Sequence, residues 1–226
     1  MTAVTHPRLP PRRTATRARS WWAKAWLRAV EESSYSDADL RVARSLARAA
    51  RVGPITVEEG RFFAAVEDDE PGAVSVTVPV LDGSAAELFV ELVGAESGRI
   101  AAMLAGDLPH QLVEEAEEGG VELLPYGGEL GASCTCHAWV DPCPHALAVG
   151  LQLSWLVDQD PFVLTHLRGL PRDVLLARLH ERGAGTASEA ADDVETGLEA
   201  MLRAERILAL IEDLDAEALT DVDHLF

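Results

Sequence analysis

Residues 133–145 read Ser-Cys-Thr-Cys-His-Ala-Trp-Val-Asp-Pro-Cys-Pro-His and contain all three cysteines of the chain. The pattern is Cys-x-Cys, then six residues, then Cys-x-His. Three thiolates and one imidazole make the donor set of a closed, tetrahedral zinc site, in which no coordination position stays open for catalysis. We therefore predict one structural Zn²⁺ as the cofactor, with ligands Cys134, Cys136, Cys143 and His145.

Two short local elements are expected to supply these ligands. Side chains two residues apart on a strand point to the same face, so Cys134 and Cys136 can reach one ion from a strand or hairpin arm. Asp141 is a candidate N-cap for the following helix, with Pro142 and Pro144 in its first turn. The last two ligands then lie at the start of an apolar helix over residues 146–157, where free backbone amides favour a thiolate.

Other interpretations of the motif stay open. Three buried thiols without a metal are one alternative, and His137 in place of His145 is another, although His137 would point to the opposite face of a continuing strand. A Cys134–Cys136 disulfide would be strained and would leave Cys143 unpaired. An iron–sulfur cluster usually requires four cysteines. Because thiolate ligands must stay reduced, we predict a cytoplasmic protein.

Charge is distributed unevenly along the chain. The 226 residues include 19 basic and 38 acidic ones, for a net charge of −19. Residues 1–52 carry 11 Lys/Arg and 4 Asp/Glu (net +7), whereas residues 53–226 carry 8 and 34 (net −26). Residues 100–167, which include the motif, have ten acidic residues and no Lys or Arg. Affinity for nucleic acid comes mainly from Lys and Arg, so any such contact is expected from these residues: Arg8, Arg12, Arg13, Arg17, Arg19, Lys24 and Arg28.

The chain is expected to have four parts. Residues 1–19, rich in Pro, Thr and Arg, predict a disordered basic arm. Residues 20–119 form an α+β region, residues 120–182 hold the zinc finger and its following helices, and residues 183–226 contain a linker and an acidic helix. The fold class is α+β, mostly helical, with a small antiparallel meander and a strand-to-helix zinc knuckle. No segment reaches the roughly 18–20 apolar residues of a membrane span.

Apolar spacing and turn signals predict the individual elements. Helices are expected over residues 21–32, 37–50, 85–93, 98–104, 110–118, 146–157, 162–168, 172–182 and 192–214. Strands are expected over residues 55–58, 61–66, 73–81 and 121–124. The face formed by Trp22, Trp26 and Val30 either packs on the body or stacks on nucleic-acid bases. The apolar stripe of the last helix either packs within the chain or docks on a partner.

The ligand pattern resembles a known family. Cys134-x-Cys136, a short loop and Cys143-x-His145 running into an apolar helix are similar to the SWIM zinc finger, which occurs in SWI/SNF ATPases, Mu-type transposases and a signalling kinase. The chain also resembles the small bacterial SWIM proteins typical of actinobacteria. This similarity lies in the Trp21-Trp22 pair and in the stretches 104–109, 160–164 and 167–169. The similarity covers roughly residues 20–182.

This resemblance implies zinc binding by the same four ligands. It also implies a role in DNA binding or protein–protein contact, often beside a helicase-like SWI/SNF ATPase. The chain departs from the family at two places. Pro144 stands where relatives often have Lys, and the acidic run 67–70 stands where relatives often have basic or small polar residues. Both departures argue against nucleic-acid binding by the body.

No enzyme signature stands out in the sequence. It has no nucleotide-binding Gly-rich loop, no Ser/His/Asp set and no paired carboxylates. We expect His110, His166 and His180 at surface or capping positions. The sequence thus predicts a non-enzymatic adaptor without a small-molecule substrate or membrane contact, whose partner is a protein such as a helicase-like ATPase. The alternative is a DNA-binding module that uses the basic arm.

Overall fold

The computed structural model describes residues 3–12 and 18–183, together with residues 198, 199, 201, 203 and 205. The chain divides into two compact units, Met1–Leu179 and His180–Phe226. The predicted linker and most of the predicted acidic helix lie outside the described residues. Leu198 and Met201, from the apolar stripe of that helix, are helical and exposed.

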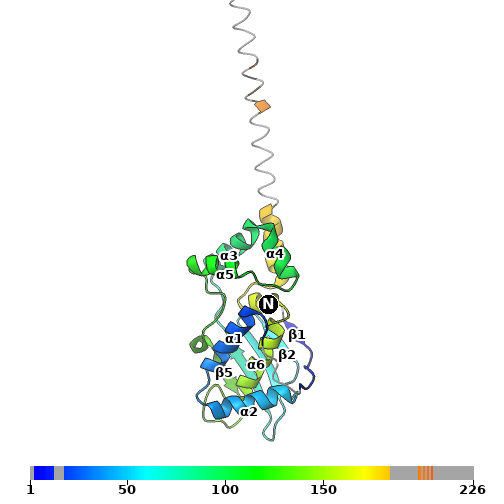
Figure 1. Cartoon of the computed structure of the whole chain (residues 1–226), viewed down its shortest axis with the longest axis vertical. Coiled ribbons are helices and arrows are strands. Elements are labelled where there is room, and N and C mark those ends of the chain that lie inside the picture. The colour runs from blue at the N-terminus through cyan, green and yellow to red at the C-terminus, as the bar shows by residue number, and fades with distance from the viewer. Residues whose placement is uncertain are drawn as a thin grey trace, which may run out of the picture. The chain divides into compact units, whose positions relative to one another are not determined.

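One antiparallel sheet organises the first unit, and its strands are neighbours in chain order (Figure 1). The strands are β1 (Val4–His6), β2 (Ile55–Glu58), β3 (Arg61–Val66), β4 (Gly72–Thr77) and β5 (Gly131–Cys134). Helices join this sheet, so the predicted α+β class is confirmed. β2 and β3 have the predicted bounds, and β4 ends four residues before the predicted strand does.

The predicted strand over residues 121–124 is wrong. Val121 and Leu123 are buried, which explains the apolar alternation, but the segment is not regular structure. The carbonyl oxygen of Glu122 accepts a hydrogen bond from the Arg168 guanidinium at 2.6 Å instead of from a neighbouring strand. A buried connector can thus imitate the period of a strand.

Both edge strands add to the predicted meander. Val4 pairs with Val57, so the prediction of a disordered arm over residues 1–19 is wrong for Val4–His6. The unpaired edge of β2 offers backbone groups to these residues, and an ion pair between Arg8 and Glu67 holds the segment that follows. At the other edge, β5 pairs with β4. The expected boundary between residues 119 and 120 therefore separates two parts of one sheet.

Helix α6 (Pro144–Val157) lies at the centre of the core, against α1 (Trp21–Glu32), α2 (Asp37–Arg48) and strands β3 to β5 (Figure 1). Every residue of α6 from His145 to Val157 is buried, as expected for a helix that is apolar on all sides. The Trp26 indole donates to the Gly150 carbonyl at 3.1 Å. The face of α1 formed by Trp22, Trp26 and Val30 therefore packs on the body, which confirms the first of the two alternatives predicted for it.

The remaining helices complete the first unit. They are α3 (Gly83–Ala95), α4 (Ser97–Leu104), α5 (His110–Glu118), the 3-10 helix η1 (Gly127–Glu129), α7 (Pro161–Leu167) and a last helix that begins at residue 172. The α-helices of this unit begin and end within two residues of the predicted bounds, whereas no helix was predicted at η1. The exact match at α1 and α5 reflects strong end signals: Ser20 caps α1 through a hydrogen bond to the Ala23 amide, and Gly119 follows α5.

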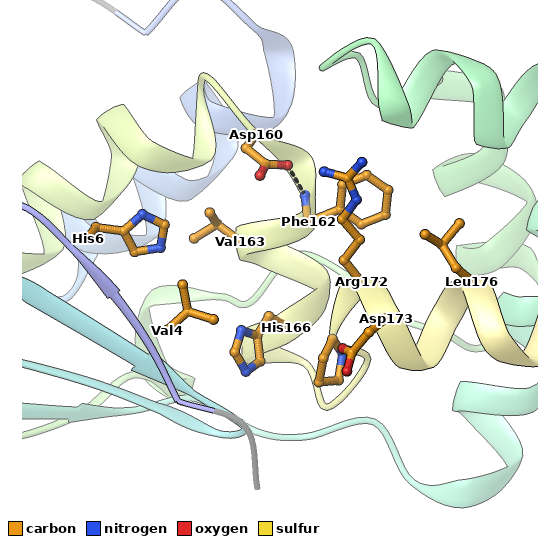
Figure 2. A pocket seen from close by; sticks show the side chains of 10 residues that line it. Val4, His6, Asp160, Phe162, Val163, His166, Arg172, Asp173 and Leu176 are labelled. Carbon is orange, nitrogen blue, oxygen red and sulfur yellow. Dashed lines mark hydrogen bonds between the residues drawn. The ribbon is translucent and has the colours of Figure 1, made fainter.

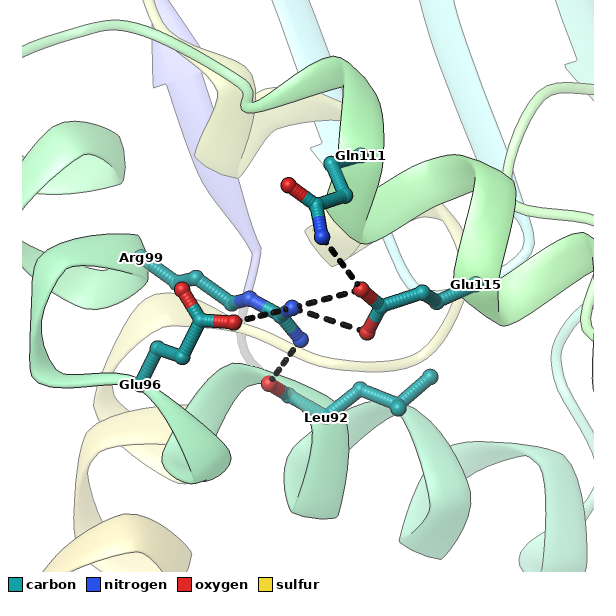
Figure 3. Close-up of polar contacts among 5 residues, drawn as sticks. All are labelled: Leu92, Glu96, Arg99, Gln111 and Glu115. Atoms are coloured by element: carbon teal, nitrogen blue, oxygen red, sulfur yellow. Dashed lines mark hydrogen bonds and ion pairs between the residues drawn. The ribbon is translucent and has the colours of Figure 1, made fainter.

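A buried arginine ties α3, α4 and α5 together (Figure 3). Arg99 donates to the Leu92 carbonyl and to the carboxylates of Glu96 and Glu115, each at 2.8 Å. Gln111 donates to the same Glu115 carboxylate at 2.9 Å. Since a buried guanidinium is tolerated only when its donors are satisfied, this cluster fixes how the three helices pack.

We expect Arg99→Met to lower the free energy of unfolding by about 2 kcal/mol. Breaking a buried pair costs about 3–5 kcal/mol, and the partial exposure of both glutamates reduces that figure. Urea denaturation measures the change. Arg178→Met is the control, because the Arg178–Glu87 pair is more exposed and such pairs contribute less than about 1 kcal/mol. Equal losses in the two variants would contradict a structural role for Arg99.

Candidate metal centre

The structure brings the four predicted ligands together. One ligand atom each from Cys134, Cys136, Cys143 and His145 lies within 4.8 Å of all the others. Among the described residues, no other group of three or more His, Cys, Asp or Glu side chains meets that criterion. These four residues could hold a metal ion.

Each ligand is placed by a different local feature. Cys134 is the last residue of β5. Thr135 extends the pairing beyond it, because its amide donates to the Ala73 carbonyl at 3.1 Å and its hydroxyl accepts from the Ala73 amide at 2.9 Å. Cys136 therefore leaves the sheet from a fixed position. His145 lies in the first turn of α6.

Cys143, and not Asp141, is the N-cap of α6. Pro144 occupies the first helical position, where its missing N–H costs nothing. The prediction that Asp141 caps the helix is wrong by two residues, because Pro142 and Pro144 left two possible starting points. Starting the helix later keeps the fully buried Cys143 at the junction of loop and helix.

One distance across the cluster fits a metal with sulfur and nitrogen ligands. Cys134 Sγ and His145 Nδ1 are 3.7 Å apart. In a tetrahedral site with Zn–S about 2.3 Å and Zn–N about 2.0 Å, such ligands lie about 3.5 Å apart. His137 is not part of this cluster. Its side chain is almost fully exposed, and its Nδ1 atom lies 3.7 Å from a Glu70 carboxylate oxygen. The alternative with His137 as the fourth ligand therefore has no support in the geometry.

The sequence did not point to Asp68, which contacts the imidazole ligand. Asp68 Oδ2 lies 3.3 Å from His145 Nε2. If Nδ1 binds a metal, the ring proton must be on Nε2, which then donates to this carboxylate; such carboxylate–histidine pairs orient metal-bound imidazoles. The amide of Asp69 and then His145 lower the pKa of Asp68, so it is ionised at neutral pH. Asp68 lies in the β3–β4 turn, far from the motif in sequence, so spacing could not reveal it.

Gly72 provides the space that the ligands occupy. A Cβ at this position would lie 2.7 Å from Cys134 Sγ and 2.8 Å from His145 Nδ1. Gly72 is the first residue of β4, and its neighbours are two ligand atoms on different elements. Only glycine allows the backbone of β4 to pass this close to the cluster.

Burial raises the pKa of two of the three thiols in the cluster. Burial raises the pKa of Cys134 to about 12, and burial also raises the pKa of Cys143, while the backbone amide of Ala146 acts in the opposite direction. Burial therefore disfavours the thiolate form of Cys134 and of Cys143 unless a positive charge lies beside them. A divalent cation supplies that charge, and thiolates are its ligands only after they lose their protons.

The charged groups that line the surface beside the cluster are mainly carboxylates, and the Arg51 guanidinium lies near enough to Asp68 to help lower the pKa of that carboxyl. A surface depression of about 360 Å³ beside it is lined by Asp68, Asp69 and Glu70, with His137 and no Lys or Arg. Two described cations of the N-terminal segment have contacts within the chain. Arg8 pairs with Glu67, and the Arg12 guanidinium lies 4.2 Å over the Trp155 ring.

A separate pocket of about 450 Å³ lies between β1, α7 and the helix that begins at residue 172 (Figure 2). Its lining is mainly apolar. The Asp160 carboxylate accepts from the Phe162 amide at 2.9 Å, and the Arg172 guanidinium lies 5.0 Å over the Phe162 ring. His166 lines this pocket and is buried, so the surface alternative predicted for it is wrong, whereas its place in the last turn of α7 fits the capping alternative. Burial lowers the pKa of His6, the second imidazole in the pocket.

Comparison with known proteins adds one relative. The chain is similar to uncharacterized protein Rv2102 of Mycobacterium tuberculosis, with 30% identity over 182 residues, which are 79% of this chain and 65% of that protein. The chain thus spans somewhat less than two thirds of that relative's length. No protein-family model matches the chain, and no solved structure matches it. Within the described residues, no helix has the length and apolar character needed to cross a membrane.

Proposed function

We propose that the chain is a SWIM-type zinc-finger protein that binds one structural Zn²⁺ and acts as a non-enzymatic adaptor between proteins. The observation that carries the zinc site is the convergence of Cys134, Cys136, Cys143 and His145 within 4.8 Å. Three thiolates and one imidazole select zinc over harder divalent ions. The strand-to-helix path from β5 to α6 is the arrangement that the SWIM resemblance implies.

Protein contact is favoured over nucleic-acid contact for the body. The depression beside the cluster is lined by carboxylates, which repel phosphate. Arg8 and Arg12, both in the basic arm predicted from the sequence, contact groups of the same chain. The partner proposed from the family resemblance is a helicase-like ATPase of the SWI/SNF type.

Metal analysis tests the first half of this proposal. The purified full chain should contain one zinc per molecule, measured by plasma mass spectrometry after extensive dialysis. Cys143→Ser should lose most of it, whereas Ser133→Ala, next to the motif, should keep it. A wild-type chain that purifies without zinc and does not take up added Zn²⁺ would exclude the site.

Affinity purification tests the second half. The tagged chain, expressed in its native host, should retain a helicase-like ATPase identified by mass spectrometry, and Cys143→Ser should not. If wild type binds zinc but recovers no more of such an ATPase than Cys143→Ser does, the result contradicts the adaptor role at that ATPase. It does not contradict the metal site.

We expect Asp68→Asn to weaken zinc affinity about tenfold, at the lower end of the roughly 10–100-fold range for groups that orient a ligand. Asparagine still accepts from the His145 ring, but it lacks the negative charge that strengthens the imidazole as a donor. Competition with a chromophoric chelator measures the change. Asp69→Asn is the matched control, since only the backbone amide of Asp69 contacts Asp68. Equal affinities for wild type and Asp68→Asn would contradict the orienting role.

A further inference from the structure

The loop between the second and third ligands carries a tryptophan that the fold does not use. Trp139 is 102% exposed, as open as in an extended peptide. The other four tryptophans pack on the core, and Trp21, Trp22 and Trp26 donate their indole N–H groups to backbone carbonyls. A large aromatic that contributes nothing to packing is typical of a binding surface, where tryptophan is among the most enriched anchor residues.

A metal bound at the cluster restricts the movement of the loop that carries Trp139. Trp139 lies between Cys136 and Cys143, so a bound metal fixes both ends of a six-residue loop. Val140 beside it is also exposed. Fixing the ends of the loop before a partner arrives reduces the backbone entropy lost on association, so a bound metal prepares this loop for binding.

The surroundings of the loop indicate the chemistry of the partner. The depression of about 360 Å³ is lined by Ala138, the residue before Trp139, and it combines apolar groups, Val42 and Pro144, with the carboxylates of Asp69 and Glu70. No Lys or Arg lines it. The apolar groups suit one aliphatic side chain, the carboxylates suit Lys or Arg, and an indole face attracts a cation through its ring electrons.

We propose that Trp139 and this depression form a docking site for a basic peptide segment of another protein, in which Arg or Lys residues alternate with apolar ones. The proposal rests on the proposed function, because the zinc site must hold the loop. A nucleic acid could also stack on an exposed indole, but the carboxylates around the depression oppose its phosphates. Electrostatic complementarity therefore favours the basic peptide.

The test is a selection of random dodecapeptides displayed on phage against the zinc-loaded full chain. Enriched sequences should carry an excess of Arg or Lys together with apolar residues. A synthetic copy of the best binder should lose about 30-fold in affinity with Trp139→Ala, the loss of a typical anchor residue. The double variant Asp69→Lys/Glu70→Lys should also weaken it. Tyr35→Ala, which removes an exposed aromatic outside the depression, should bind like wild type.

Zinc content measured on the same samples separates the two proposals. One zinc per chain in Trp139→Ala with lost peptide binding supports the docking site. One zinc per chain with peptides that lack basic residues, or with equal affinity for Trp139→Ala, overturns it and leaves the zinc site intact. A single-stranded oligothymidine or a second copy of the chain that binds through Trp139, where peptides do not, overturns it as well. Absence of zinc from wild type overturns the proposed function itself.

Discussion

Removal of zinc is expected to lower the melting temperature of the chain by about 10–20 °C. A ligand that binds only the folded state at a free concentration 10⁴-fold above its Kd stabilises that state by about 5 kcal/mol, and each kcal/mol shifts the melting temperature of a domain of this size by about 2–4 °C. The loss should be global, because the ligands join β5 to α6, and α6 is buried along its length.

Circular dichroism with and without a strong chelator measures this shift, and hydrogen exchange locates it. Exchange should rise first in β5, in the loop before Cys143 and in the first turn of α6, whereas the β2–β3 hairpin should change least. Restored Zn²⁺ should return the original melting temperature. Cys143→Ser should match the chelated wild type and should not respond to chelator. An unchanged melting temperature after verified metal removal would contradict a structural role for the site.

Gly72→Ala is expected to reduce zinc affinity by more than the roughly 10–100-fold that outer-shell changes cost. The new Cβ would lie 2.7 Å from Cys134 Sγ and 2.8 Å from His145 Nδ1, closer than real Cβ contacts allow. Two of four ligand atoms must then move, and neither belongs to a flexible side-chain end. One added methyl group thus disturbs the metal site without changing any ligand.

Gly98→Ala is the matched control, because a Cβ at Gly98 in α4 meets nothing within 4 Å. It should keep the affinity of wild type. Chelator competition and melting temperature, both measured with and without zinc, distinguish the expected result from general misfolding: Gly72→Ala should approach the melting temperature of the metal-free wild type. If Gly72→Ala binds zinc as tightly as wild type does, the close approach of β4 to the ligands is not a constraint.

The cluster of Cys134, Cys136, Cys143 and His145 could be predicted from sequence because all four residues lie within twelve positions. Helix ends were also predictable where a cap marks them, as Ser20 does for α1. What spacing could not show is contact between distant segments. Gly72 and Asp68 meet the ligands through the β3–β4 turn and the β4–β5 pairing, more than sixty residues before them in the chain.

The edge strands illustrate the same difficulty. Val4–His6 is a short segment between polar and proline-rich residues, and nothing local distinguishes it from a disordered tail. It becomes a strand because β2 presents a free edge fifty residues later in the chain. Residues 121–124 show the opposite error: their alternation suits a strand, but no strand lies beside them to pair with. Pairing partners, and not local patterns, decide both cases.

The central place of α6 has a consequence during synthesis on the ribosome. Helices α1 and α2 are made first, but the helix that covers their apolar faces is completed only at Val157, more than a hundred residues later. Such long-range contacts slow folding and leave apolar surface open to chaperones or to aggregation in the meantime. The ligand motif leaves the ribosome immediately before α6. We therefore expect that zinc binding at this stage determines when α6 packs on α1 and α2. Zinc-starved cells should then yield a smaller amount of folded protein, in addition to protein of lower stability.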